Sequence, residues 1–239
     1  MRKSTLLIGT ALAGVMAAGA TANAASEGWY VSGGVGANWV DDDSFATTTF
    51  FSGSFSSFTT TLAGSVDYDT GWALMAAIGY RFAGNWRLEG EFSGRWDDLS
   101  SSFSGAFYSA SITGDVQTTA LLANIVYDLN IADQLNLSLG GGVGYGWVDY
   151  EANFAGTFTT TFFPTTFTYT TSGTFSDDNS GFAYQLIAGL DFEVSDTTEL
   201  FVEYRYFGIN DDDSSTLRGL DDYTANTVLV GVRASLGQQ

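Results

Sequence analysis

The feature that most constrains this sequence is a two-residue alternation of apolar and polar or small side chains, which recurs in eight segments. The segment 86–97 shows it most clearly, because Trp86, Leu88 and Phe92 fall on one face while Arg87 and Glu89 fall on the other. Successive side chains of a β-strand point to opposite faces, so a period of two predicts strands and not helices. The fold class is therefore predicted to be all-β.

The alternating segments are close to the length at which a tilted strand crosses a bilayer, about 9 to 11 residues. They span residues 29–39, 71–82, 86–97, 116–129, 135–147, 182–193, 200–207 and 227–236. No stretch after residue 25 approaches the roughly 20 consecutive apolar residues that a transmembrane helix needs. Any membrane span of this chain is therefore predicted to be built from strands.

The connections between these segments alternate in length. Three are short (83–85, 130–134 and 194–198), and four are long (41–69, 98–115, 149–181 and 209–223). Outer-membrane barrels have short periplasmic turns and longer extracellular loops, and an even strand count leaves both termini periplasmic. The pattern predicts an eight-stranded antiparallel, up-and-down transmembrane β-barrel in the outer membrane, with both mature termini on the periplasmic side.

The third long loop, residues 149–181, leaves the strand count open. It is rich in Thr and Phe, which favour strands, and the only proline of the chain, Pro164, lies near its middle where a turn is expected. One interpretation is a hairpin that extends above the membrane. The other is an additional strand pair, which would make ten strands.

Alternation alone does not say which face lies inside, because a soluble lipocalin-like barrel turns its apolar face inward. Tryptophans gather at the strand ends, among them Trp29, Trp39, Trp72 and Trp96, as in the aromatic girdles of membrane barrels. The opposite face is rich in Gly, Ala, Ser and Asn, which suits the narrow interior of eight strands. A water-facing exterior without lysine would be unusual. These features favour the membrane barrel.

Residues 1–24 have the features of a secretory signal peptide. Arg2 and Lys3 precede an apolar stretch at 6–16, and Ala22-Asn23-Ala24 supplies a small-residue cleavage site. The outer-membrane barrel domain is therefore predicted to comprise residues 25–239.

Composition excludes several classes of function. Arg2 and Lys3 account for two of the 8 basic residues, so six arginines remain against 27 acidic residues. A nucleic-acid-binding surface needs clustered basic residues, so no nucleic acid partner is expected. The chain has no cysteine and no histidine, which removes disulfides, thiolate or imidazole metal sites and His-dependent catalysis. We expect no enzymatic activity and no cofactor.

Five of the six arginines fall on the small-residue face together with six carboxylates, and we predict that they form a charge network in the barrel lumen. The predicted members are Arg81, Arg87, Glu89, Glu91, Arg95, Asp128, Asp191, Glu193, Glu203, Arg205 and Arg233. Arginine's planar fork suits carboxylates, and charges in a narrow interior are tolerable when paired. A structural network that fills the lumen is favoured over a gated polar path, because eight strands leave little room for solvent.

Acidic residues also recur beside each long loop and would form a rim of carboxylates at the extracellular surface. They are Asp41, Asp42, Asp43, Asp67, Asp69, Asp97, Asp98, Asp115, Asp149, Glu151, Asp177, Asp178, Asp211, Asp212, Asp213, Asp221 and Asp222. Such oxygen ligands suit calcium or magnesium, which could bridge the rim to lipopolysaccharide phosphates. The favoured alternative is a solvated rim that limits strand extension, because no run has the ordered spacing of a calcium loop.

The chain resembles the small outer-membrane barrels of the opacity-protein-like porin family of Gram-negative bacteria. The resemblance rests on residues 28–34 (GWYVSGG), 182–191 (FAYQLIAGLD) and 226–233 (NTVLVGVR), and it covers the whole mature chain. It implies a surface-exposed barrel that serves envelope integrity, adhesion or weak porin-like roles.

The function expected from these observations is that of a non-enzymatic structural and surface-interaction protein of the outer membrane. Its expected partners are outer-membrane lipid and lipopolysaccharide, and an extracellular ligand that contacts the first and third long loops, 41–69 and 149–181. The alternative is a narrow cation-preferring channel, since an acidic rim would concentrate cations at its mouth.

Overall fold

The computed structural model describes residues 27–40, 43–52, 57–68, 70–105, 108–162, 165–211 and 222–236. The predicted signal peptide at 1–24, Pro164 and the rim residues Asp41, Asp42, Asp69, Asp212, Asp213 and Asp221 lie outside these ranges. The described residues form ten strands. Within the same ranges, no helix is long and apolar enough to cross a membrane.

The strands, in chain order, are β1 (Gly28–Val40), β2 (Asp43–Ser52), β3 (Ser57–Tyr68), β4 (Gly71–Arg81), β5 (Trp86–Gly105), β6 (Tyr108–Ala132), β7 (Leu135–Phe162), β8 (Thr165–Ser195), β9 (Thr198–Asp211) and β10 (Asp222–Ser235).

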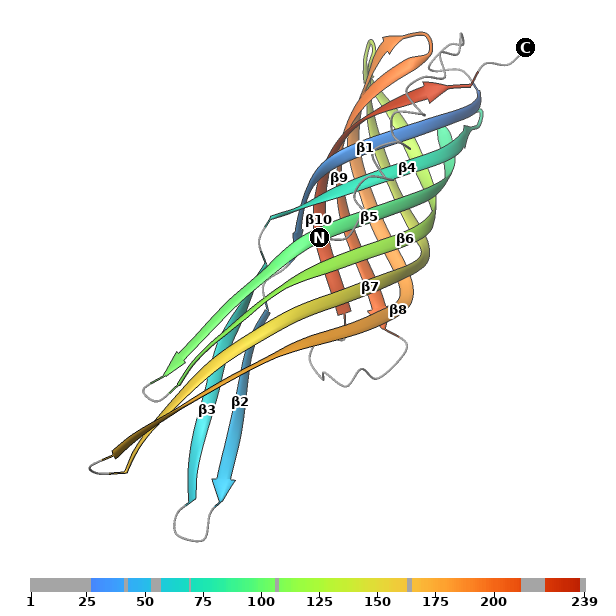
Figure 1. Cartoon of the computed structure of the whole chain (residues 1–239). Helices are drawn as coiled ribbons and strands as arrows, with labels where there is room; N and C mark the ends of the chain where they lie inside the picture. The colour runs from blue at the N-terminus through green and yellow to red at the C-terminus, as the bar shows by residue number, and fades with distance from the viewer. Residues whose placement is uncertain are drawn as a thin grey trace.

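Eight of these strands close into a barrel (Figure 1). β1 pairs antiparallel with β4 on one side and with β10 on the other, so that Tyr30 lies opposite both Gly79 and Ser235. From β4 to β10 each strand pairs with the next in the sequence. The prediction of an eight-stranded antiparallel barrel is therefore confirmed.

The two ends of the barrel differ. At one end, which we call the turn end, short turns join β4 to β5, β6 to β7 and β8 to β9, and β1 begins and β10 ends there. Gly84, Asn85 and Gln134 adopt positive φ angles of 84°, 68° and 68° in two of these turns, a conformation that glycine adopts without strain and asparagine tolerates well. The opposite end, which we call the hairpin end, carries the long connections.

Most of the residues predicted as long loops are strands in the structure. β5 and β6 stay paired as far as Gly105 and Tyr108, and β7 and β8 as far as Phe162 and Thr165, so both pairs project far beyond the barrel (Figure 1). The interpretation of residues 149–181 as an extended hairpin is confirmed. The strands continue through these connections because Thr-, Tyr- and Phe-rich segments go on pairing wherever a neighbouring strand also continues.

The extra strand pair lies in the first long connection and not in the third. β2 and β3 form a hairpin with each other, and β3 contacts the barrel sheet only through the pairs of Asp67 with Ser100 and Tyr68 with Leu99. The hairpin therefore stands beside the extended strands (Figure 1) and adds no strand to the barrel.

Solvent exposure identifies the outer face. Leu121 is 53% exposed, whereas the adjacent Leu122 is 4% exposed, and the same alternation runs along the barrel strands. Aromatic side chains pair on the outer face at both ends of the alternating segments. Trp72 stacks on Trp96 with ring centroids 4.1 Å apart, and Trp29 packs edge-on against Tyr80 at 5.4 Å. The apolar face is thus outside, as in a membrane barrel.

Candidate functional site

The interior of the barrel is filled by side chains, and near the turn end most of them are charged. Among the described residues, five arginines and seven carboxylates are buried: Arg81, Arg87, Arg95, Arg205, Arg233, Glu89, Glu91, Asp97, Asp128, Asp191, Glu199 and Glu203. They reach the interior because they occupy alternate positions of β4 to β10. Buried charges are stable only when paired and hydrogen-bonded, so the partner of each arginine matters.

Arg205 bridges two carboxylates on different strands in the middle of the barrel. Its Nη1 lies 2.6 Å from Glu91 Oε1, and its Nη2 lies 2.6 Å from Glu203 Oε2. Glu91 also accepts hydrogen bonds from Asn124 at 2.7 Å and from Gln185 at 3.2 Å. This cluster links β5, β6, β8 and β9 across the lumen. Its ion pairs and hydrogen bonds compensate the buried charges of Arg205, Glu91 and Glu203.

A second cluster lies nearer the turn end and contains three carboxylates, each of which pairs with at least one arginine. Arg81 donates two hydrogen bonds to Glu199, at 2.7 and 3.0 Å, and Arg233 Nη1 lies 2.7 Å from both Glu199 and Asp191. Arg87 lies 2.8 Å from Asp128. Because Arg81 and Arg87 are opposite each other across β4 and β5, these carboxylates separate two like charges.

Tyr30 joins the members of this cluster. Its hydroxyl donates to Glu89 Oε1 at 2.6 Å, and Glu89 also pairs with Arg87 at 3.0 Å. The guanidinium carbons of Arg81, Arg87 and Arg233 lie 5.9, 6.0 and 5.6 Å from the centre of the Tyr30 ring. A ring at this distance stabilises cations, so Tyr30 is a structural centre of the network.

Arg95 differs from the other four buried arginines. Its guanidinium lies 3.8 Å from the centre of the Phe207 ring, and its hydrogen bonds go to Ser93 at 3.3 Å and Thr227 at 3.4 Å. Within the described part of the chain it makes no ion pair, since its contacts are a ring face and two hydroxyl groups. Its charge is stabilised mainly by the aromatic face.

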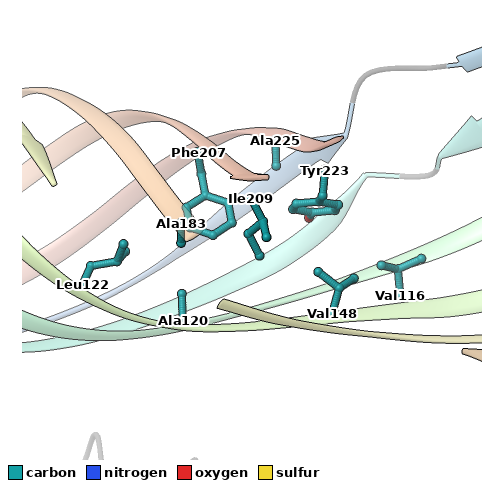
Figure 2. Close-up of a cluster of buried hydrophobic side chains, with 9 residues drawn as sticks. All are labelled: Val116, Ala120, Leu122, Val148, Ala183, Phe207, Ile209, Tyr223 and Ala225. Carbon is teal, nitrogen blue, oxygen red and sulfur yellow. The ribbon is translucent and has the colours of Figure 1, made fainter. Parts of the chain in front are cut away.

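Nearer the hairpin end the lumen becomes apolar. Figure 2 shows a cluster in which side chains from opposite walls of the barrel face one another: Val116, Ala120, Leu122, Val148, Ala183, Phe207, Ile209, Tyr223 and Ala225. Leu122, Phe207 and Ile209 are 4%, 0% and 3% exposed. We call this group the apolar plug. The lumen therefore has two layers, a charged layer near the turn end and the apolar plug near the hairpin end, where buried Asp97 also accepts a hydrogen bond from Tyr223 of the plug at 3.2 Å.

Inward-facing glycines make room for these side chains. A Cβ atom added to Gly146 would lie 2.5 Å from Ile209 Cδ1, and one added to Gly144 would collide with the backbone carbonyl of Leu121. The row of glycines on β7 is thus needed because the lumen is crowded at these positions, as the sequence pattern indicates.

The structure brings together nine of the eleven residues predicted for the lumen network: Arg81, Arg87, Glu89, Glu91, Asp128, Asp191, Glu203, Arg205 and Arg233. Arg95 lies apart from them, against Phe207. Glu193 is half-buried at the turn end and accepts a hydrogen bond from Asn136 at 3.2 Å; it makes no ion pair with the arginines of the described ranges.

Sequence reasoning missed three members of the interior. Glu199 shares the parity of Glu203 and Arg205 and falls one residue before the segment that begins at Leu200. Tyr30 lies on the inner face of β1, where its ring was not expected to contact arginines. Asp97 was assigned to the rim, yet it is buried and accepts hydrogen bonds from Asn38 at 2.8 and 2.9 Å. Parity alone identifies Asp97, which lies within the predicted segment 86–97, and it identifies Glu199 once the segment 200–207 is extended by one residue.

A closed antiparallel barrel with an apolar exterior, aromatic girdles and a buried charged interior is a transmembrane β-barrel of the outer-membrane type. The sequence matches the outer membrane protein beta-barrel domain family over residues 8–235, so the chain belongs to that family. No curated protein sequence matches the chain.

Several solved structures have a similar arrangement of strands. Neisserial surface protein A (NspA) is 12% identical, with 87% of this chain and 96% of that chain covered and a TM-score of 0.46. OprG from Pseudomonas aeruginosa is 14% identical over 91% and 99% of the two chains, with a TM-score of 0.45. Ail, the attachment invasion locus protein of Yersinia pestis, is 19% identical over 87% and 98%, with a TM-score of 0.40. These similarities concern the fold alone.

Proposed function

We propose that this protein is a non-enzymatic surface-interaction protein of the outer membrane, in which a side-chain-filled barrel holds extended strands above the membrane. In this arrangement the turn end and both mature termini are periplasmic, and the hairpin end is extracellular. The observation that carries the proposal is the combination of a lumen occluded by two layers with a large strand extension at the hairpin end.

The extension has two chemically different faces. The face that continues the lumen side of the barrel carries Leu99, Ile112, Phe154 and Phe175, and Phe154 and Phe175 remain 42% and 40% exposed. The opposite face is mainly Ser, Thr, Asp and Glu. Exposed apolar surface rimmed by polar residues is typical of interaction sites. We therefore propose this aromatic face, together with the β2–β3 hairpin, as the contact region for an extracellular ligand.

Adhesion of expressing cells tests the contact region. The probe is a polystyrene surface, which binds exposed aromatic groups without requiring a particular ligand. Cells that carry Phe154→Ser and Phe175→Ser should adhere several-fold less than wild-type cells, whereas cells with Asn153→Ser and Thr174→Ser, on the opposite face of the same strands, should adhere normally. Equal adhesion of all three strains, at equal surface levels, would count against a contact role for this face.

The outer face just beyond the aromatic girdle is proposed to contact outer-membrane lipid, including lipopolysaccharide. Asp98, Asp115 and Glu151 lie opposite one another on β5, β6 and β7, two residues or more beyond Trp96. No group of three such residues in the described ranges is arranged to hold a metal ion alone. A divalent cation would therefore have to share its coordination with lipid phosphates. Identical thermal unfolding in calcium and in chelator would exclude this bridge.

A further inference from the structure

One part of the membrane-facing wall is hollow. A groove of about 740 Å³ lies on the outer face of β1 and β4 to β7, and Ile78, Phe92, Leu121 and Val143 are among the outward side chains that line it. Each of these four side chains is about half exposed. The groove opens away from the barrel and is separated from the lumen network by the sheet itself.

Two small residues form the floor of the groove. Gly90 and Ala123 are paired side by side on β5 and β6, between Ile78 on β4 and Val143 on β7. The neighbouring row, toward the hairpin end, carries Phe92 and Leu121 at the same two strands. The small side chains of Gly90 and Ala123 therefore produce the hollow. A large outward side chain at either position would fill it.

Gly90 is not required by packing within the protein. The nearest atom to a Cβ added at Gly90 is the carbonyl oxygen of Ile78, at 4.0 Å, so the position is open. By contrast, a Cβ added at Gly94, four residues further along the same face of β5, would lie 2.5 Å from the Trp96 ring. Glycine weakens a strand interior and often marks a site where another molecule approaches closely. A molecule that approached Gly90 closely would lie outside the barrel, because Gly90 is on the exposed outer face of β5.

The position of the groove in the bilayer identifies its occupant. Gly90 lies six residues from Trp96 of the hairpin-end girdle, which at about 3.3 Å per residue and a tilt of about 40° corresponds to a depth of about 15 Å. This depth is half of the roughly 30 Å hydrocarbon core. The groove is therefore at the level reached by the ends of acyl chains of the leaflet on the hairpin side, and it continues the lipid-facing surface of the barrel.

We propose that the groove binds the terminal part of an acyl chain from an outer-leaflet lipid. The walls are apolar and the floor is flat, so a flexible hydrocarbon chain can fill the space without a polar partner. A second copy of this chain fits less well, since a stable protein interface buries more than about 1,000 Å² and the hollow is only two strands wide at its floor. This acyl-chain site is separate from the proposed extracellular contact region.

A large side chain at Gly90, on the floor of the groove, tests the proposal. Native mass spectrometry of protein extracted from outer membranes in mild detergent measures how much lipid stays bound. The wild-type protein should retain lipid, and Gly90→Ile should lower the retained fraction at least fivefold. Ala188→Ile provides the matched control, because Ala188 is a small outward residue on β8, outside the groove. Heat-modifiable migration verifies that each variant is folded.

A second readout uses a defined lipid. Addition of dimyristoylphosphatidylcholine to the detergent-solubilised protein should raise the unfolding temperature of the wild type and of Ala188→Ile, and should raise that of Gly90→Ile much less. The proposal is wrong if the wild type retains no lipid, if both isoleucine variants lose lipid equally, or if Gly90→Ile retains as much as the wild type. A dimer that Gly90→Ile abolishes would assign the groove to a second copy and would also overturn it.

Discussion

At the scale of single residues, the interior shows how differently one residue type can be stabilised. Arg205 has two carboxylates within 2.6 Å, whereas Arg95 faces the Phe207 ring and two hydroxyls. Removal of one partner of a buried ion pair leaves an uncompensated charge, which costs about 3 to 5 kcal/mol. Removal of an arginine that has no carboxylate partner leaves no such charge.

This contrast predicts the outcome of two leucine substitutions. Arg205→Leu should destabilise the barrel by about 3 kcal/mol or more, because Glu91 and Glu203 lose their shared cation. Arg95→Leu should cost much less. Urea unfolding in detergent, followed by the shift between folded and unfolded bands on a gel, measures both. Equal losses for the two variants would show that the ion pairs do not determine stability.

A second residue-scale prediction concerns pH. Asp98 lies beyond the Trp96 girdle, and its pKa is raised, first by partial desolvation and then by its hydrogen bond with and charge repulsion from Asp115. A carboxyl group with a raised pKa in the folded state stabilises the fold in acid, and that contribution is lost as the pH rises through the folded-state pKa. At neutral pH two ionised carboxylates then face each other across β5 and β6.

Asp98→Asn should therefore raise the unfolding temperature at pH 7 and leave it nearly unchanged below about pH 3.5, where the wild-type carboxyl is protonated. Asp196→Asn, in the turn between β8 and β9, changes the net charge equally and serves as the control. A stabilisation of the same size at both pH values would contradict the explanation.

At the scale of elements, sequence patterning predicted the eight barrel strands and their inner and outer faces, because the bilayer enforces a strict period of two. It failed at the hairpin end. There β5 and β6 extend eight residues beyond the predicted segments, and β7 and β8 extend by more than ten. These extensions include segments such as 165–176, whose Ser and Thr alternate with aromatic residues and give no membrane signal. The apolar plug was also not predicted, because Ile209 and Tyr223 were assigned to a loop.

The crowded glycine row of β7 leads to a prediction at this scale. Gly144→Val should prevent folding of most of the protein, because the added atoms would displace the backbone of β6 near Leu121. Val143→Ala, the outward neighbour on the same strand, should have a small effect on the folded yield. Heat-modifiable migration of freshly extracted outer membranes measures that yield. Normal yield of Gly144→Val would show that the interior is less tightly filled than the structure indicates.

At the scale of the whole molecule, the proposed function gives the barrel and the extended strands separate tasks. The interior of the barrel is filled by ion pairs, by the apolar plug and by a second apolar cluster that includes Met75, Phe201 and Leu229. A hydrophobic constriction blocks ions even where the rest of a pore is polar, because water leaves it. In the proposed function, the extended strands then carry the contacts with an extracellular ligand.

Single-channel recording in planar bilayers tests this central claim most directly. The wild-type barrel should show no reproducible open state, and neither should Leu121→Ala, whose side chain lies on the outer face. Combined Leu122→Ala, Phe207→Ala and Ile209→Ala substitutions shrink only the apolar plug, so the ion-paired layer nearer the turn end should still keep the lumen closed. A wild-type protein that opens with a reproducible, cation-preferring conductance would contradict the account of a closed lumen.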